Sequence, residues 1–188
     1  MTGGIGAGKS ETLRAFARHG AAVVSSDEIV HRLLRADPEV KRAIVERFGD
    51  GVLGPGREID RRQVANVVFT SREELAWLEQ LLHPRVAAEY MRWREDLAGL
   101  PNPPAVCVTE VPLLYETGAE ERFDAVVAVT ASPEVRISRS MTPDITVRER
   151  RLIPDDEKLE RADFAYVNDG TLEELDAFVS GVMAKLTA

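Results

Sequence analysis

The sequence predicts an α/β fold built on a parallel sheet, and three observations support this class. Short apolar runs recur at wide intervals, as in strands that are buried on both faces of a parallel sheet. The segments between these runs have helical patterns, and alternating strands and helices are typical of a doubly wound sheet. A glycine-rich turn also opens the chain just before a helical pattern. The expected strands are Ala21–Val24, Ala105–Thr109, Asp124–Val129 and Phe164–Val167.

Helical patterns begin directly after the glycine-rich turn. Lys9–His19 places Leu13 and Phe16 on one face, and Gly20 ends this pattern. Glu39–Phe48 also repeats its apolar residues at helical spacing. Both segments are therefore expected to be amphipathic helices.

Capping signals mark further helices. Ser71 is expected to cap a helix over Arg72–Leu82, with Glu74 completing a capping box. Pro84–Leu97 is expected to continue this helix after a break or kink, because proline lacks the N–H that a helix interior uses. Near the end of the chain, Thr171 is expected to cap a helix over Leu172–Leu186, again with Glu174 completing a capping box.

The stretch from Asp27 to Gly99 has no strong strand signal and is too long for a plain crossover helix. We expect a helical insertion here, after the strand Ala21–Val24. The connection Asn102-Pro103-Pro104 would then return the chain to the sheet.

Composition narrows the class of protein. The chain has 188 residues, a formal net charge of -8 and a pI near 5.0. It is therefore a poor candidate for non-specific nucleic-acid binding, which depends on Lys and Arg. No apolar run approaches the roughly 18 residues of a membrane span, and no signal-peptide pattern is present. Cys107 is the single cysteine, so no intramolecular disulfide and no zinc-ligand spacing is expected. These features predict a single-domain cytoplasmic protein without nucleic-acid or membrane partners.

The glycine-rich turn fits the phosphate-binding pattern G-x-x-x-x-G-K-[ST] as Gly3-Gly4-Ile5-Gly6-Ala7-Gly8-Lys9-Ser10. Glycine lets a backbone approach an anion closely, and the loop N–H groups with the following helix N-terminus would face the β-phosphate of ATP. Lys9 would act as a catalytic residue that bridges the β- and γ-phosphates, and the Ser10 hydroxyl would bind Mg²⁺. The alternative is a glycine-rich turn with an accidental Gly-Lys-Ser.

The place of this loop in the chain is unusual. A phosphate-binding loop should follow the buried first strand of the sheet, but only Met1 and Thr2 precede Gly3. Either the sheet lacks this strand or the natural start lies upstream, and we favour the upstream start. In both cases nothing in the chain is expected to supply the strand that should hold the loop.

Two carboxylates follow strands at their carboxyl ends, where the ligand crevice of an open α/β sheet lies. Asp27 comes just beyond Ala21–Val24, and it could accept the proton of an acceptor hydroxyl or contact Mg²⁺ through water. The alternative is that Asp27 caps a helix starting at Glu28. Glu110 follows Ala105–Thr109 and would act on Mg²⁺ through water, or be an ordinary strand-end charge.

Further motifs run in order over nearly the whole chain, and the series resembles the dephospho-coenzyme A kinase family. The opening Met1–Ser10 is similar to the family's L-T-G-G-I-G-S-G-K-S. The loop alone is generic, whereas the ordered series is specific. The family patterns L-D-R…I-V-F, L-E-x-I-x-H-P, I-P-L-L-F-E, A-D-F and N-D-G have counterparts in Ile59-Asp60-Arg61 with Val67-Val68-Phe69, Leu78–Pro84, Val111–Glu116, Ala162–Phe164 and Asn168–Gly170.

The resemblance implies transfer of the γ-phosphate of ATP to the ribose 3′-hydroxyl of dephospho-CoA, with Mg²⁺ as cofactor. It implies a three-layer parallel sheet of the P-loop NTPase type with a helical CoA-binding insertion and a short lid. The nucleotide-binding core would comprise residues 1–28, 105–131 and 161–188. Residues 29–104 would bind the acceptor, and residues 132–160 would form the lid.

The resemblance also implies roles for single residues. Asp27 matches the family's catalytic aspartate, and His83 matches a residue of the acceptor pocket. Asp27, His83, Glu110 and Arg139 are therefore expected to bind substrate. Asn168 matches the loop near the adenine and is expected to bind the nucleotide. The protein would be a monomer or a weak homo-oligomer.

Several positions depart from the family pattern. Ser25 stands where an aspartate is usual, and Glu110 replaces an aspartate with a longer side chain. Glu11 follows the loop serine, where a carboxylate near phosphates is mildly unfavourable. Leu152 stands where glutamine is common, and the lid from Arg136 to Lys158 is shorter than the family pattern. The lid arginines expected to neutralise the transferred phosphoryl group, or else to belong to a solvated helix face, are Arg139, Arg148, Arg150 and Arg151.

Two other functions stay open at this point. The chain could be a nucleoside or nucleotide kinase of related architecture, although the His83-Pro84 and Pro112-Leu113-Leu114 patterns argue against it. It could also be a nucleotide-binding protein without catalysis, given the missing strand and the shortened lid.

Overall fold

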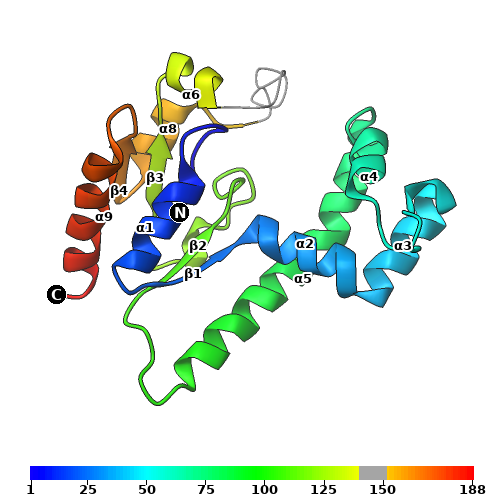
Figure 1. Ribbon diagram of the computed structural model, residues 1–188, viewed down its shortest axis with the longest axis horizontal. Coiled ribbons are helices and arrows are strands. Elements are labelled where there is room, and N and C mark those ends of the chain that lie inside the picture. The colour runs from blue at the N-terminus through cyan, green and yellow to red at the C-terminus, as the bar shows by residue number, and fades with distance from the viewer. Residues whose placement is uncertain (140–151) are drawn as a thin grey trace. The chain divides into compact units, whose positions relative to one another are not determined.

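The computed structural model describes residues 1–139 and 152–188, which divide into two units. One unit combines residues 1–25 with residues 102–188 and contains the strands. The other unit comprises residues 26–101 and is helical. Figure 1 colours both units from the N-terminus to the C-terminus.

Parallel strand pairs form at the apolar runs that the sequence predicts. β1 (Ala22–Ser25) pairs with β2 (Cys107–Glu110), and β3 (Val127–Thr130) pairs with β4 (Phe164–Val167). Valine and threonine recur in them because branched side chains suit a pleated, packed surface. The predicted strands and their parallel direction are confirmed. Burial on both faces holds for β3, but that prediction is wrong for β4, where every second residue is exposed.

The first two residues of the chain lie between these strand pairs. On the β3 side, Thr2 forms a parallel bridge with Ala128 through backbone hydrogen bonds of 2.9 and 3.0 Å. On the β2 side, the Met1 carbonyl accepts from the Val111 N–H at 2.9 Å, and the Met1 amino group donates to the Thr109 carbonyl at 2.7 Å. As expected, no strand of the described residues precedes the loop, but these hydrogen bonds hold the two residues before it. Two residues link both strand pairs where a full strand was expected, and the upstream start stays a prediction.

Two helices form the apolar core of this unit with the strands. α1 (Lys9–Arg18) packs against α9 (Leu172–Leu186), as Figure 1 shows, and both match the predicted helices. Burying one such leucine, valine or phenylalanine contributes roughly 1.5–3 kcal/mol. The predicted capping box of α9 is also confirmed, because Thr171 and Glu174 exchange hydrogen bonds of 3.2 and 2.8 Å. The buried side chains of the two helices in this core include Leu13, Phe16, Leu175, Val179 and Val182.

Short elements lie between the strands and complete this unit. The 3₁₀ turn η2 (Glu120–Arg122) precedes β3, and α6 (Pro133–Arg139) follows it. α8 (Asp155–Arg161) leads into β4. These segments matter because α6 and α8 carry side chains that reach the glycine-rich loop.

Helices fill the second unit, as the sequence predicts. They are α2 (Ser26–Ala36), α3 (Pro38–Phe48), α4 (Arg61–Val68) and α5 (Arg72–Ala98), with a 3₁₀ turn η1 (Asp50–Val52). Aspartates cap two of them, since Asp37 accepts from the Glu39 N–H at 2.8 Å and Asp60 accepts from the Arg62 N–H at 2.8 Å.

α5 runs through Pro84 as one helix. The break that the sequence suggests at this proline is therefore absent. Proline costs a helix one backbone hydrogen bond and crowds the preceding turn. In that turn, the Arg85 guanidinium donates to the Leu81 carbonyl at 2.8 Å, which gives the disturbed backbone an additional donor.

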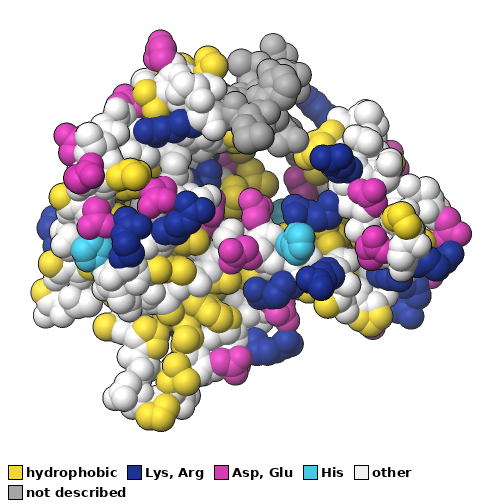
Figure 2. Space-filling view, in the orientation of Figure 1, with side chains coloured by type: hydrophobic (Ala, Val, Ile, Leu, Met, Phe, Trp, Pro, Cys, Tyr) yellow, Lys and Arg dark blue, Asp and Glu magenta, His cyan; other side chains and the backbone are white. Residues whose placement is uncertain are grey.

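Charged side chains of both signs lie beside one another on the face shown in Figure 2. Arg47, for example, donates to Glu74 at 2.9 Å. The Glu74 side chain therefore pairs with an arginine. Of the capping box predicted at Ser71, the structure shows the hydrogen bond from the Glu74 N–H to the Ser71 hydroxyl, at 3.4 Å. Exposed pairs of this kind contribute little to stability, because water and salt screen them. Within the two described ranges, no helix combines the length and the apolar character that crossing a membrane would need.

Candidate functional site

The glycine-rich loop occupies residues 3–8, and α1 begins directly after it at Lys9. Gly8 has a φ of 92° and a ψ of 19°, a left-handed conformation that residues with a side chain rarely adopt. A β-carbon at this position would also overlap the side-chain amide of Asn168. Backbone conformation and packing both require glycine immediately before the lysine.

Side-chain donors bind carbonyl groups along this loop. In a trans peptide, the carbonyl of one residue and the N–H of the next point in opposite directions. A side chain that donates to a loop carbonyl therefore turns the N–H of the next residue away from that side chain. An anion site in a tight loop is formed by such backbone N–H groups. The donor–acceptor pairs are Lys9 Nζ to Gly4 O at 2.9 Å, Arg136 Nε to Ile5 O at 2.8 Å, and Asn168 Nδ2 to Ala7 O at 2.9 Å.

Lys9 and Glu110 lie together beside the loop. The distance from Lys9 Nζ to Glu110 Oε1 is 3.9 Å, and the two side chains are 12% and 8% exposed. Glu110 ends β2 and is in register with Ser25, the last residue of β1. The carboxylate that the sequence places at a strand end thus faces the loop lysine at a buried position, where charges interact more strongly than in water.

The amino group of Met1 lies in the same part of the unit. Burial lowers the pKa of this amino group from 8.0 to about 5, and the Glu110 carboxylate partly opposes the effect. A positive charge is costly there because the group has lost most of its water. The amino group is therefore neutral at neutral pH while it donates to the Thr109 carbonyl.

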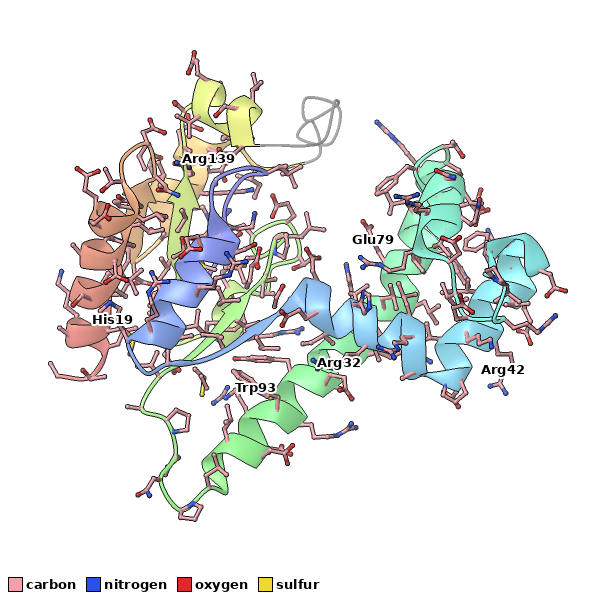
Figure 3. The ribbon with its side chains drawn as sticks, in the orientation of Figure 1. His19, Arg32, Arg42, Glu79, Trp93 and Arg139 are labelled. Atoms are coloured by element: carbon pink, nitrogen blue, oxygen red, sulfur yellow. The ribbon has the colours of Figure 1, made fainter. Side chains whose placement is uncertain are left out.

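Asn168 and Arg139 meet at the Gly8 end of the loop. Asn168 follows β4, is buried, and donates its backbone N–H to the Thr130 carbonyl at 2.7 Å. Its own carbonyl accepts from Arg139 Nη1 at 2.8 Å. Figure 3 labels Arg139 at the end of α6, next to the turn that precedes α1. These two predicted residues are thus brought to the loop, whereas the predicted lid residues Arg148, Arg150 and Arg151 lie outside the described residues.

Arg136 and Asp155 also reach the loop, and the sequence pattern did not single out either of them. Arg136 Nη1 lies 2.7 Å from Asp155 Oδ2, and the side chains are 11% and 25% exposed. A signal for the arginine existed, because Arg136 precedes Arg139 by three residues and shares its helix face. No spacing rule links positions 136 and 155, so only the folded chain reveals the pair.

The start of α1 carries the residues that follow the lysine. Ser10 is exposed there. Glu11, the unusual carboxylate, pairs with Arg14 at 2.8 Å and with Arg18 at 3.0 Å. Hydrogen bonds from Arg14 and Arg18 lower the pKa of Glu11. The arginines balance the negative charge that the sequence comparison identifies as unfavourable at this position.

Asp27 and His83 belong to the helical unit. Asp27 is exposed in the first turn of α2, which begins at Ser26, so it does not precede the helix as a capping residue would. His83 is exposed on α5, next to Pro84. Their proximity to the loop stays a prediction.

The donor groups at the loop suit Mg²⁺. Ser10 offers a hydroxyl oxygen and Glu110 a carboxylate, and Mg²⁺ prefers oxygen ligands. Within residues 1–139 and 152–188, no cluster of three or more Asp, Glu, His or Cys residues could hold a metal ion alone. Mg²⁺ usually keeps several waters and binds nucleotide phosphates, so it needs only one or two protein ligands.

Known proteins resemble this chain over almost its whole length. The family model described as dephospho-CoA kinase (CoaE) matches residues 1–174. A dephospho-CoA kinase from Streptomyces avermitilis is 38% identical over 192 residues, covering 99% of this chain and 92% of the relative. One from Protochlamydia amoebophila is 36% identical over 181 residues, covering 93% and 89%.

Solved structures have the same fold. The crystal structure of TT1252 from Thermus thermophilus has a TM-score of 0.79 at 34% identity and covers 100% of this chain and 96% of that chain. A dephospho-CoA kinase from Campylobacter jejuni has a TM-score of 0.71 at 23% identity, covers 99% and 94%, and agrees in fold. Since the family model and full-length relatives agree, the chain belongs to the dephospho-CoA kinase family.

Proposed function

We propose that this dephospho-CoA kinase holds ATP at the loop of residues 3–10 and uses Asp27 to activate the ribose 3′-hydroxyl of dephospho-CoA. One observation carries the nucleotide site. Arg136 and Asn168 bind the carbonyls of Ile5 and Ala7, so the N–H groups of Gly6 and Gly8 turn away from these donors, as an anion site in the loop requires.

Lys9 supplies the positive charge for the transferred phosphoryl group. Its amine contacts the Gly4 carbonyl and lies 3.9 Å from Glu110. A lysine has a long flexible stem, so the amine can exchange these contacts for phosphate oxygens when ATP enters. Asn168 serves the nucleotide by fixing the Ala7 carbonyl, and Arg139 adds a positive charge at the Gly8 end.

Asp27 takes the proton of the acceptor hydroxyl as the new O–P bond forms and the bond between the γ-phosphate and ADP breaks. Its place in the chain supports this role, because it follows Ser25, the register partner of Glu110, by two residues. A Mg²⁺ ion bound by Ser10, with Glu110 acting through water, would neutralise charge on the phosphates.

The remaining assignments follow the family pattern. Residues 29–104 would bind the acceptor with His83, and residues 132–160 would form the lid with Arg139. The rest would be the nucleotide-binding core, a three-layer parallel sheet of the P-loop NTPase type. We also propose that the protein is cytoplasmic and is a monomer or a weak homo-oligomer.

A coupled assay of ADP release tests the acceptor. Purified protein receives ATP, Mg²⁺ and either dephospho-CoA or a panel of nucleosides and nucleotides. We expect ADP release with dephospho-CoA alone, and phosphorus NMR of the product should locate the new phosphate on the ribose 3′-oxygen. Transfer only to a nucleoside or nucleotide would contradict the proposed acceptor. If the protein binds ATP but turns over no acceptor, it is a nucleotide-binding protein without catalysis.

A further inference from the structure

α6 places an arginine directly against the glycine-rich loop. Arg136 Nε donates to the Ile5 carbonyl at 2.8 Å, and Nη1 of the same guanidinium lies 2.7 Å from Asp155 Oδ2 on α8. We propose that Arg136, held by Asp155, is a positioning residue that fixes the orientation of the peptide between Ile5 and Gly6. This inference rests on the proposed function, in which that peptide belongs to the ATP site.

The peptide geometry shows what this hydrogen bond controls. The Ile5 carbonyl and the Gly6 N–H belong to one planar trans unit and point in opposite directions. A donor on the carbonyl therefore sets the direction of the N–H. An amide that already points at the phosphate site does not have to be reoriented when ATP binds, which is the advantage of a preorganised site.

Close packing leaves the arginine little freedom. Gly6 has a φ of 77°, and a β-carbon there would lie 2.8 Å from the Arg136 carbonyl oxygen. A β-carbon on Gly4 would lie 2.8 Å from Asp155 Oδ2 and 3.1 Å from the guanidinium carbon of Arg136. The approach of the α6 backbone and the positive φ thus require glycine at position 6, and Gly4 lies in close contact with the Arg136 and Asp155 side chains.

Asp155 determines how Arg136 acts. An arginine beside an ATP site could bind phosphate directly, but this guanidinium uses one N–H on a loop carbonyl and another on a carboxylate. The carboxylate balances its charge and holds its plane, because a guanidinium fork fits such paired contacts. Arg136 therefore acts on the nucleotide through the loop.

The base of α8 is itself anchored, which fixes Asp155. Glu116 Oε1 accepts from the Ile153 N–H at 2.9 Å and lies 3.3 Å from Lys158 Nζ. The Lys158 side chain is 0% exposed, and the Glu116 side chain is 13% exposed. A line of contacts thus runs from the segment after β2, through α8 and Asp155, to Arg136 and the loop.

Arg136→Met and Asp155→Asn test the proposal, each as a single variant and together. Steady-state kinetics should show the KM for ATP rising about tenfold in Arg136→Met, because a hydrogen bond to a charged donor is lost. The KM for dephospho-CoA should stay within about twofold. Asp155→Asn should raise the KM for ATP less, about threefold. The double variant should have the same KM for ATP as Arg136→Met, since Asp155 acts through Arg136. Arg136→Lys should not restore affinity, because an ammonium cannot serve both partners with the same geometry.

The direction of the Asp155→Asn effect separates positioning from direct phosphate binding. If Arg136 bound phosphate, releasing it from Asp155 would tighten ATP binding, and this result would overturn the proposal. Arg161→Met is the matched control, because Arg161 at the end of α8 forms two ion pairs, with Glu120 and Glu157, and touches no loop carbonyl in the described contacts. Its KM for ATP should be unchanged.

Lys9→Ala distinguishes failure of this inference from failure of the proposed function. Loss of ATP binding in Lys9→Ala, together with unchanged affinity in Arg136→Met, would reject the positioning role and keep the ATP site. Unchanged affinity in both variants would reject the ATP site itself. Melting temperatures of all variants show whether a loss of affinity reflects a loss of folded protein.

Discussion

Asn168 joins the end of β4 to the loop through both its side chain and its backbone. The amide donates to the Ala7 carbonyl at 2.9 Å, and the backbone N–H donates to the Thr130 carbonyl at 2.7 Å. Because the side chain is buried against Gly8, a residue of another shape cannot replace it without moving the loop. The residue that resemblance assigns to the nucleotide thus contacts the loop itself.

Asn168→Asp should weaken ATP binding about tenfold, because it replaces the N–H donor by a second acceptor that faces the Ala7 carbonyl. Calorimetric titration with ATP measures this loss. Asp169→Asn is the matched control: its side-chain oxygen can still accept from the Ser132 N–H, which now donates to Asp169 Oδ1 at 2.7 Å. Equal ATP affinity of Asn168→Asp and the unchanged protein would show that the contact with Ala7 is dispensable.

Asp27→Asn should lower kcat by about 100-fold to 10,000-fold, the range that a general base contributes. Affinity for ATP should be retained, because the change removes a proton acceptor and keeps the shape of the side chain. Turnover with dephospho-CoA and a separate ATP titration check the two halves of this expectation. Glu28→Gln, one exposed residue further along α2, should behave as the unchanged protein. Near-normal turnover in Asp27→Asn would reject the assigned role.

Motif chemistry was sufficient to find residues that lie in the loop, at a strand end or against the loop. Lys9, Glu110 and Asn168 all lie at or beside the loop in the structure. It could not find Arg136 and Asp155, because a carboxylate and an arginine become partners only when α6 and α8 are packed on the loop. The three-residue spacing of Glu11 and Arg14 on a predicted helix could have indicated their ion pair.

At the scale of elements, α8 depends on one buried charge pair. Lys158 and Glu116 face each other at 3.3 Å. Among the described residues, Lys158 Nζ and Glu116 Oε2 have no hydrogen-bond partner. Each charge is therefore compensated mainly by the other, and breaking the pair leaves an uncompensated charge in a dry environment.

Lys158→Met should lower the free energy of unfolding by about 3–5 kcal/mol, the usual cost of leaving one charge of a buried pair alone. The double variant Lys158→Met/Glu116→Gln should recover most of this loss, because the amide oxygen can still accept from Ile153 while the charge is gone. Urea unfolding measures both. Lys185→Met on α9 serves as control, since Lys185 is exposed and should cost less than about 1 kcal/mol. A double variant no more stable than Lys158→Met would contradict this account.

Periodicity predicted the helices and strands well where burial follows one face. α9 has the predicted bounds, and β4 also has them, although its exposure was misjudged. An apolar run does not reveal whether a second layer covers both faces of a strand, which explains the error at β4. The continuity of α5 through Pro84 was also beyond the pattern, because a proline weakens a helix locally without always ending it.

At the scale of the molecule, the buried Met1 amino group predicts a pH dependence of stability. Its pKa is about 5 in the folded chain and 8.0 in the unfolded chain. Above pH 8.0 the group is neutral in both states, but between these values only the unfolded chain takes up the proton. Stability should therefore fall as the pH drops from 8.0 to about 5, by about 4 kcal/mol in total, and this group should add no further loss below that.

Urea unfolding between about pH 8.5 and about pH 5 measures this loss, after mass spectrometry has shown that Met1 is retained. Other groups titrate in the same range, so the comparison that matters is with the same chain preceded by additional residues. That chain has a peptide bond in place of the amino group and should lose less stability. Identical pH profiles for the two chains would show that the amino group is not buried as described.

The family could be predicted from the sequence because its motifs extend across both units in a fixed order. The role of Met1 and Thr2 could not, because two residues carry no strand pattern and their partners lie in β2 and β3. Hydrogen bonds from both sides hold these two residues between the strand pairs. The sheet thus satisfies the backbone groups before the loop although the sequence there is too short to be recognised as a strand.

The carbonyl contacts of the loop have a consequence for the order in which the protein matures. The loop is translated before its supports, since synthesis proceeds from the N-terminus. Its supports arrive much later: the donor to Ile5 is residue 136, and the donor to Ala7 is residue 168. A nascent chain can therefore expose the complete phosphate-binding motif long before the backbone is held in its final form. In the proposed ATP site, ATP can therefore stabilise the finished loop only after residue 168 has been translated.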